Sequence, residues 1–584
     1  MSINLHSTCL FHVFYQLLNC YNADKFFQLA PVVSIFAHLS KFANVSSFFR
    51  STILRSVSSF LITTNPSFTY PKHKSQLKFL QQFFHACSFS IISLINSTSI
   101  PDFNSISMNS LSLHDLDDTL KDTLVHQILL CNKIYKLENL SVTCICSQWL
   151  LDELSLMLPC LKSLTLNDTI LSTEILIFPS NFESLTVLTI ELSSTRKLSN
   201  IDVSRLFNLQ KLSFWGHSQS FLSGLSSLSR LSFLSLRNVS RCDALHPQAT
   251  LSFLSVDNIP STALDLIFSQ KYNFIKCKMK FERCIVSSQL DWTLQFCSHV
   301  SLYSNSTIQS LSGATHPNTE SLNFYAANSV LLNLQSCKRL SSLLLDHCKI
   351  LNGQLCISQL LLLLKLEVRK VEASILFLIL NHSPYLHQLS VHKLYNDVPG
   401  TITSLNYLRR LSVVNSSYFF ASLPCLPRLY QLEVFRIVQF DISLVHQMFP
   451  SLFALNISSC PLLVTTNHKV SSVRRLRLYA NSPENCREHV LAVSVFTNIE
   501  HLIVNFPFSF LSLEQLIPLP SVKFCWLRVP FAIVKKWLEQ LDVEVVVHAD
   551  LYVTNADKVE AKLLCSRLIQ CQRVSKLVLV FDES

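Results

Sequence analysis

Residues 452–463 read LFALNISSCPLL and contain the pattern that decides the fold. Leu452, Leu455 and Ile457 are spaced L-x-x-L-x-L, and Cys460 follows three residues later. Because side chains alternate along a strand, a short strand places Leu455 and Ile457 on one face, and Leu452 enters from the bend before it. The stretch therefore predicts a short strand with one apolar face, and it becomes informative because the chain repeats it.

The same spacing recurs at regular intervals along most of the chain. Named by their first residue, the matches begin at Leu137, Leu161, Leu185, Leu209, Leu231, Leu251, Phe274, Cys297, Thr319, Leu340, Leu363, Leu386, Leu408, Leu429, Leu452, Val473, Ile499 and Val522. Successive first residues lie about 20 to 26 residues apart, which is the period of leucine-rich repeats. Over most of residues 137–530 the chain therefore resembles the leucine-rich-repeat family. The alternative is a leucine-rich globular protein in which the spacing has no structural meaning.

The resemblance implies an α/β fold, a leucine-rich-repeat solenoid. One repeat cannot bury its own apolar face, so stacked repeats share a continuous core. We expect the strands to pair in parallel along a curved sheet, with a helix at residues 375–380 on the convex side. Imperfect matches that begin at Met108 and Val574 extend the series at its two ends, whereas residues 537–557 break the period.

The composition argues against several classes of function. Of the 584 residues, 49% are apolar and 15% are charged, which is typical of a chain that buries a large core. Five glycines, and neither G-x-x-x-x-G-K-[ST] nor G-x-G-x-x-G, leave no common nucleotide-binding loop. The net charge of +10 is mild for this length, so nucleic-acid binding is the least favoured function.

Cysteine usage and the N-terminus predict a soluble protein of the cytoplasm or nucleus. The 20 cysteines are scattered, and Cys277, Cys297 and Cys525 occupy apolar repeat positions, where a free thiol behaves as a small hydrophobe. The N-terminus lacks the basic start of a secretory signal, and no apolar run reaches the roughly 18 residues that a membrane helix needs.

The first 55 residues follow a helical period rather than the repeat. Apolar residues at three- and four-residue steps mark one helix face, namely Leu10, Val13, Phe14 and Leu17. Two further apolar faces follow, after Asp24 and after Pro31. The predicted organisation is a helical bundle at 1–55, a transition, linker or solenoid cap at 56–105, and the solenoid at 106–584.

The predicted bundle resembles an F-box. That family opens with L-P-x-E-x-L-x-x-I-F, and residues 5–14 here read LHSTCLFHVF, with His6 where proline is usual and Thr8 where an acid is usual. The later pattern L-A-x-V-x-x-x-F appears from Leu29 to Phe36. The resemblance implies that a Skp-type adaptor in a cullin complex contacts Leu5, His6, Leu10, Val13, Phe14, Leu17, Leu29, Val32 and Phe36. The alternative is a helical cap that shields the first repeats.

The sequence offers no recognisable catalytic or metal site. Neither G-x-S-x-G nor H-E-x-x-H occurs, and no two cysteine pairs have zinc-ligand spacing. His347 beside Cys348 is interpreted as a strand-end histidine next to a core cysteine. We therefore predict no enzymatic activity, no metal and no cofactor.

Residues that flank the core positions predict a binding surface on the concave face, because they point to the other side of the sheet. Arginine and aromatic residues supply most binding hot spots. The candidate substrate-binding residues are Trp215, Arg237, Lys276, Lys278, Lys280, Tyr303, Tyr325, Arg369, Arg410, Phe435, Arg475, Arg477, Tyr479 and Trp526, with Asp257, Lys365, Glu367, Glu433 and Arg528 on the same face. Lys276, Lys278 and Lys280 alternate with Cys277 and Met279, so they share one face that fits an acidic protein segment or a phosphate.

The two resemblances together predict a substrate-recognition subunit of an SCF-like, cullin-type ubiquitin ligase. The N-terminal helices bind the adaptor, and the concave repeat face binds a protein substrate. The alternative is a non-catalytic leucine-rich-repeat scaffold or recognition protein that is unrelated to ubiquitin.

Overall fold

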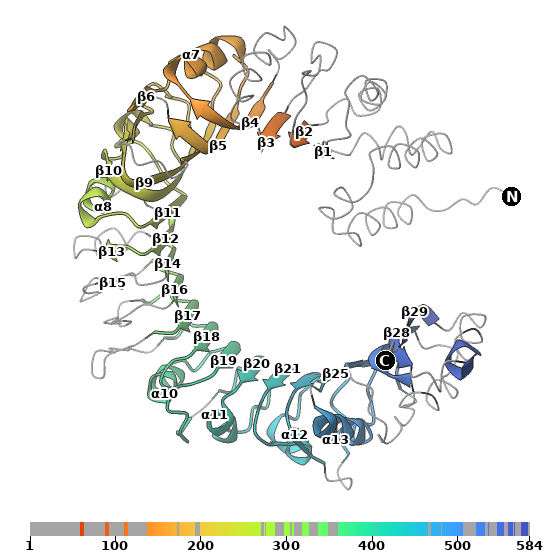
Figure 1. Ribbon diagram of the computed structural model, residues 1–584. Helices are drawn as coiled ribbons and strands as arrows, with labels where there is room; N and C mark the ends of the chain where they lie inside the picture. Colours follow the sequence, from red (N-terminus) through yellow and green to blue (C-terminus); the bar gives the residue numbers. More distant parts are fainter. Residues whose placement is uncertain are drawn as a thin grey trace, which may run out of the picture. The chain divides into compact units, whose positions relative to one another are not determined.

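A computed structural model shows parallel strands that follow one another along the chain (Figure 1). It describes residues 59–63, 88–92, 110–114 and 137–581, the last range with breaks at 172–173, 193–198, 270–273, 275, 287–296, 304–306, 309–317, 326–333, 335–336, 349–359, 403–404, 465–468, 481, 506–520, 532–534, 536–545, 554–558, 564–565 and 567–573. The predicted helical bundle and its F-box-like residues lie outside the described residues.

The chain divides into two compact units, Met1–Thr293 (unit 1) and Leu294–Ser584 (unit 2). The described strands of unit 1 are β1 (Ser59–Thr63), β2 (Ser88–Ile92), β3 (Ser110–His114), β4 (Asn139–Cys146), β5 (Ser163–Leu171), β6 (Ile175–Ile177), β7 (Val187–Leu192), β8 (Ser199–Asp202), β9 (Lys211–Ser223), β10 (Phe233–Cys242), β11 (Phe253–Asp257), β12 (Lys278–Glu282) and β13 (Ile285–Val286). Its described helices are α7 (Gln148–Met157), the 3-10 turn η4 (Leu225–Ser227) and α8 (Ser261–Ile267).

Strands of consecutive repeats pair in parallel throughout unit 1. The order of pairing is β1, β2, β3, β4, β5, β7, β9, β10, β11, β12. Strand β6 pairs with β8, and β8 pairs with the second half of β9. The imperfect match at Met108 is confirmed as a repeat, because Leu111 and Leu113 pair with Leu140 and Val142.

Unit 2 is built in the same way. Its described strands are β14 (His299–Tyr303), β15 (Thr307–Ile308), β16 (Ser321–Tyr325), β17 (Ser342–Asp346), β18 (Lys365–Arg369), β19 (Gln388–His392), β20 (Arg410–Val414), β21 (Gln431–Phe435), β22 (Phe440–Asp441), β23 (Ala454–Ser458), β24 (Leu462–Leu463), β25 (Arg475–Tyr479), β26 (His501–Asn505), β27 (Phe524–Pro530), β28 (Val546–Val553) and β29 (Val574–Phe581). Strands β14, β16–β21, β23 and β25–β29 pair in parallel, each with the next.

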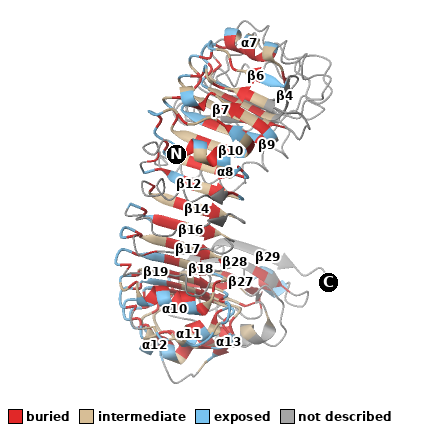
Figure 2. Cartoon of the chain, turned by 90° about the vertical axis from the view of Figure 1, so that its left-hand side faces the viewer, coloured by how far each residue is buried: buried red, intermediate tan, exposed pale blue. Residues whose placement is uncertain are grey.

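The leucine pattern forms the core, as the sequence predicts. Leu455 pairs with Leu432 on one side and Leu476 on the other, and all three are at most 1% exposed. The first residue of the pattern, Leu452, is also fully buried, and its backbone N–H donates to Phe449. Figure 2 shows buried residues that recur from strand to strand. The fold is therefore an α/β leucine-rich-repeat solenoid.

Helices and irregular segments close the repeats on one side of the sheet. In unit 2 they are α10 (Ala373–Asn381), α11 (Ser417–Ala421), the 3-10 turn η7 (Ile442–Leu444), α12 (Val445–Met448) and α13 (Pro483–Val493). Figure 1 shows α10–α13 on the same side of the unit 2 strands. Helix α10 confirms the helix predicted at residues 375–380, and it buries Leu376, Ile379 and Leu380.

The structure corrects two predictions made from the sequence. Strand β12 begins at Lys278, and its core residues Met279 and Phe281 pair with Leu254 and Val256, so the match at Phe274 was assigned two residues too early. Residues 537–557 do not simply break the period, because they contain β28. That strand pairs in parallel with β27 and β29. Ala549 lies 22 residues after its partner Leu527 and 28 residues before its partner Leu577, so only the second interval is longer than the predicted period.

A residue with left-handed backbone ends many of the strands. It lies two positions after the second core residue in the repeats that carry Asn238, Asn258, Arg283, His347, Lys370, Lys393, Asn415, Arg436 and Ser459. The N–H of Lys370 donates to the carbonyl of His392 in the next repeat. This residue therefore makes one more hydrogen bond between the parallel strands before the chain turns. In a chain with five glycines, asparagine is the side chain best suited to this conformation.

Substitution at Lys370 tests this role of the left-handed turn. We expect Lys370→Val to lower the free energy of unfolding by about 1–2 kcal/mol, because a β-branched side chain is strained at positive φ. We expect Lys370→Asn to raise it by a few tenths of a kcal/mol, since asparagine tolerates this backbone. Urea denaturation measures both effects. The control is Lys365→Val, at an exposed strand position of the same repeat, which should change stability little.

Candidate binding surface

The strand residues that alternate with the buried ones form one face of each sheet, here called the open face. In β21 the buried Leu432 and Val434 alternate with Gln431, Glu433 and Phe435, which are partly exposed. The same alternation occurs in β19, in β25 and in the first five residues of β10. The open faces of unit 1 and unit 2 are described separately.

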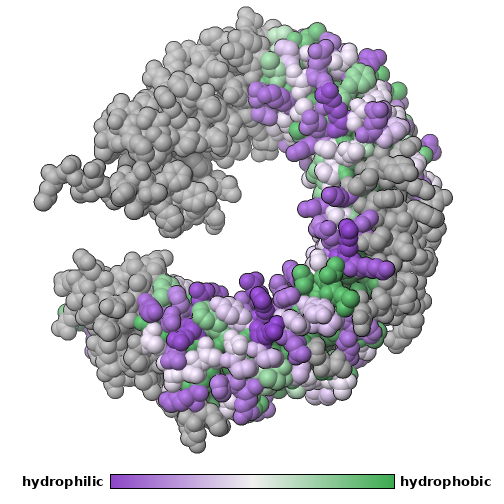
Figure 3. All heavy atoms as spheres, turned by 180° about the vertical axis from the view of Figure 1, so that it is seen from behind, coloured by the Kyte–Doolittle hydropathy of each residue, from purple (hydrophilic) through white to green (hydrophobic). Residues whose placement is uncertain are grey.

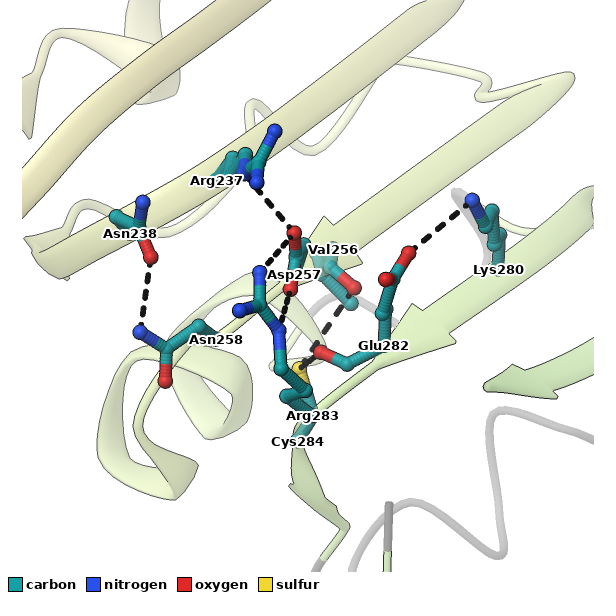
Figure 4. Close-up of polar contacts among 9 residues, drawn as sticks. All are labelled: Arg237, Asn238, Val256, Asp257, Asn258, Lys280, Glu282, Arg283 and Cys284. Carbon is teal, nitrogen blue, oxygen red and sulfur yellow. Dashed lines mark hydrogen bonds and ion pairs between the residues drawn. The ribbon is translucent and has the colours of Figure 1, made fainter. Parts of the chain in front are cut away.

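Asp257 is the centre of a charged cluster on the open face of unit 1 (Figure 4). The guanidinium of Arg283 donates from Nε to Oδ1 at 2.8 Å and from its terminal nitrogen to Oδ2 at 2.6 Å, which is a bidentate pair. Nε of Arg237 lies 3.1 Å from the same Oδ2. The hydrogen bond that Arg283 donates to Asp257 raises the pKa of the Arg283 guanidinium above its usual value. One mostly buried carboxylate thus holds two exposed arginines in fixed positions.

One aromatic ring lies beside this cluster, and two more stack at the other end of the same strands. The guanidinium of Arg237 lies 5.7 Å from the ring centroid of Trp215, which is 38% exposed on the neighbouring strand β9. Phe233 and Phe253, at the first open-face position of β10 and β11, stack with centroids 4.6 Å apart. The open face of unit 1 therefore presents Arg237 over the ring of Trp215, an arrangement that a cation–π contact stabilises.

The predicted row of three lysines is only partly correct. Lys278 and Lys280 lie on β12 and alternate with buried Met279, and Nζ of Lys280 lies 3.3 Å from Glu282. Lys276 lies before the strand in a left-handed conformation, so it does not continue the alternation. The reason is the two-residue shift of this repeat. The basic side chain that joins the cluster instead is Arg283, from the turn after β12.

Removal of the Asp257 carboxylate should cost measurable stability. We expect Asp257→Ala to lower the free energy of unfolding by about 1 kcal/mol at low salt, and by less at high salt, because both arginine partners are substantially exposed. The matched control is Glu282→Ala, which breaks a single exposed pair with Lys280 and should have a smaller effect. Equal losses in the two variants would contradict a special role for Asp257. Chemical denaturation at two salt concentrations gives the comparison.

The open face of unit 2 begins with a pair of stacked tyrosines. The ring centroids of Tyr303 on β14 and Tyr325 on β16 are 4.3 Å apart, and the ring planes are nearly parallel. Burial, with a further contribution from Tyr303, raises the pKa of Tyr325. The phenol of Tyr325 is therefore neutral near pH 7 and can donate or accept a hydrogen bond to a partner.

Beyond β17, which separates them from Tyr325, polar residues of β18 and β19 form a group. Arg369 forms an ion pair with Glu367 on the same strand. His392 lies opposite Arg369 in the register of the two strands. Its Nε2 is 3.0 Å from the hydroxyl of Ser390. Burial first, and then the charge of Arg369, lower the pKa of His392 below its usual value, so the ring is neutral at physiological pH.

The remaining candidate residues of unit 2 continue along the same face. Strand alternation places them in register at open-face positions, namely Arg410 on β20, Phe435 on β21, Arg475, Arg477 and Tyr479 on β25, and Trp526 on β27. The guanidinium of Arg475 lies 5.3 Å from the ring centroid of Phe453, a residue that sequence reasoning missed because it precedes β23. Arg436, a turn residue, similarly lies over Phe435.

The described residues contain no cluster of potential metal ligands. Within that part of the chain, no group of three or more His, Cys, Asp or Glu side chains could hold a metal ion. Cys277, Cys297 and Cys525 are fully buried, as predicted, and burial raises the pKa of the Cys277 thiol to about 12. Among the helices of the described segments, none has both the length and the hydropathy to cross a membrane.

Comparisons with known proteins point to the fold alone. No family model matches the chain, and no curated protein matches it. Among solved structures, the chain is similar to CroV588, described as a novel circular leucine-rich-repeat protein, with 13% identity, 85% of this chain and 76% of that chain covered, and a TM-score of 0.50. A complex of TLR13 with ssRNA13 is 16% identical, with 79% of this chain and 84% of that chain covered, and has a TM-score of 0.36. A TDR receptor has 12% identity, coverage of 82% and 90%, and a TM-score of 0.27. The first likeness agrees with a leucine-rich-repeat solenoid, and the other two carry no argument.

Proposed function

We propose that this chain is a non-catalytic recognition protein whose open face binds a protein partner. The observation that carries the proposal is the Trp215–Arg237–Asp257–Arg283 arrangement, in which a largely buried carboxylate fixes two exposed arginines beside an exposed tryptophan. Tryptophan and arginine dominate binding hot spots, and side chains that are already ordered lose less entropy on binding. The open face of unit 2, taken by itself, also carries arginine and aromatic residues.

Site-specific photo-cross-linking in cells tests this proposal. A photoreactive amino acid in place of Trp215 should give a discrete protein adduct that is lost when Arg237→Glu is also introduced. The same amino acid in place of Leu266, an exposed residue of α8 away from the strands, should not give that adduct. Identical adducts from both positions, or none from position 215, would exclude the open face of unit 1 as the binding surface.

We further propose that the recognition protein serves a cullin-type ubiquitin ligase of the SCF kind. What supports this is the F-box resemblance of residues 5–36, together with its position ahead of a leucine-rich-repeat solenoid. A Skp-type adaptor bound there holds substrate on the open face close to the transferase and raises its effective concentration. The chain itself performs no chemical step.

Co-purification of the full chain with a Skp-type adaptor tests the ligase proposal. Recovery of the adaptor should be lost in the variants Leu10→Asp and Phe14→Asp, and it should persist in Trp215→Ala. If the intact chain recovers no adaptor, and deletion of residues 1–55 causes aggregation, the N-terminal segment is a cap and the ligase proposal is wrong. The open-face proposal survives that outcome, because its cross-linking test does not involve the adaptor.

A further inference from the structure

Large apolar side chains are exposed at the edge of the unit 2 sheet where the chain enters strands β18–β21. We call Leu361, Leu362, Leu364, Tyr385, Tyr407 and Tyr430 the edge patch. Leu362, Tyr385 and Tyr430 expose 52%, 43% and 49% of their surface. Figure 3, which shows the molecule from behind, displays a compact group of hydrophobic residues among polar ones. Soluble proteins rarely expose several large apolar residues together unless they bind something.

The edge patch is ordered by the repeat itself. Leu362, Tyr385 and Tyr407 each lie four residues before the first core residue of their strand, so they occupy equivalent positions in consecutive repeats. The ring centroids of Tyr385 and Tyr407 are 5.2 Å apart. The equivalent residue of the next repeat is Arg428, whose guanidinium lies 4.7 Å from the ring centroid of Tyr407. Leucine, tyrosine and arginine thus form one continuous row across four repeats.

A second row runs beside the first. Tyr430 stacks on Phe453 of the following repeat with ring centroids 4.8 Å apart and planes 6° from parallel. The residue equivalent to Tyr430 in the preceding repeat is Arg409. The two are neighbours, since the carbonyl of Arg409 accepts the N–H of Tyr430. Both rows lie just before the strands, and the second row borders the open face, because Arg475 contacts the ring of Phe453.

The charge around the edge patch is mainly positive. Basic residues outnumber acidic ones between residues 361 and 433, where Lys365, Arg369, Lys370, Lys393, Arg409, Arg410 and Arg428 stand against Glu367, Glu372, Asp397 and Glu433. Glu367 is already paired with Arg369. Asp397 is already used within the fold, since its carboxylate accepts the backbone N–H groups of Tyr418 and Phe419 at the start of α11. The arginines next to the tyrosines therefore attract a partner that carries negative charge.

We propose that the edge patch binds an acidic peptide segment of another protein, one that carries leucine or aromatic side chains among aspartates and glutamates. Its apolar side chains cover the exposed leucines and tyrosines, and its carboxylates pair with Arg409 and Arg428. Arginine is suited to this task because its guanidinium can contact a ring and a carboxylate at once. The edge patch belongs to unit 2, whereas the proposed function rests on the Asp257 cluster of unit 1, so the inference does not depend on that proposal.

Selection of short random peptides on the immobilised full chain tests the inference. Enriched peptides should combine Asp or Glu with Leu, Phe, Trp or Tyr. An enriched peptide, labelled with fluorescein, should bind the full chain in an anisotropy titration that weakens with salt. Tyr407→Ser and Arg428→Glu should each weaken its binding by about tenfold or more.

Two control variants separate the edge patch from other surfaces. Tyr418→Ser replaces a tyrosine that is 59% exposed on α11, outside the patch, and should leave binding unchanged. Arg237→Glu, on the open face of unit 1, should also leave it unchanged. Enrichment of peptides without acidic residues, or equal binding by Tyr407→Ser and the unmodified chain, would overturn the inference. Self-association that Tyr407→Ser abolishes would assign the patch to a second copy of this chain and would also overturn it.

Discussion

Leu432→Ala is expected to lower the free energy of unfolding by about 3 kcal/mol, the loss typical of a buried leucine whose cavity cannot collapse. Leu432 is fully buried and lies between Leu411 and Leu455 of the neighbouring repeats. Because stacked repeats are stabilised by the interfaces between them, the loss should spread to β20 and β23. Hydrogen exchange measured by mass spectrometry should therefore show faster exchange in all three strands.

The alternation of faces provides the control for Leu432. Ser412→Ala changes an open-face residue of β20, the neighbouring strand, and should alter stability by less than about 0.5 kcal/mol. Its peptides should keep the exchange rates of the unmodified chain. Comparable destabilisation by the two variants would mean that the two sides of the sheet have been assigned incorrectly.

Acid is expected to destabilise the repeat that contains α13, through His489. Burial lowers the pKa of this histidine to about 4, from the ordinary value of about 6.5 that it regains on unfolding. Its Nε2 lies 3.0 Å from the carbonyl of Cys460, to which the neutral ring donates. The folded state therefore binds this proton less readily than the unfolded state, so stability is fully present above about pH 6.5 and falls as the pH decreases toward 4.

The size of the acid effect follows from the shift in pKa. A difference of about 2.5 pKa units corresponds to roughly 3 kcal/mol, reached near pH 4 and constant below it. His489→Gln keeps an N–H donor for the carbonyl of Cys460 but does not titrate. Urea denaturation of both proteins from pH 7.5 to 4 should give curves that diverge below about pH 6.5. Parallel curves would show that His489 is not the group responsible, because other titrating groups contribute equally to both.

Much of the fold could be predicted from residue spacing, because a strand needs only two apolar residues on one face and the repeat supplies them at each turn. The assignment failed around Phe274, where Phe274, Cys277, Met279 and Phe281 are all buried and the pattern fits in two frames. Only pairing with β11 fixes the register there. Strand β28 was missed because its segment is rich in valine rather than leucine, and the pattern was recognised by leucine.

The sequence by itself determined the repeat, the apolar face of each strand and the residue types that alternate with it, since these depend only on local backbone geometry. The tertiary structure decided which of those residues meet. Arg283 reaches Asp257 from the turn of the next repeat, and Tyr407 meets Arg428 across a repeat boundary. Contacts of this kind depend on the register between strands about 20 residues apart, and that register is set by the packing of the shared core.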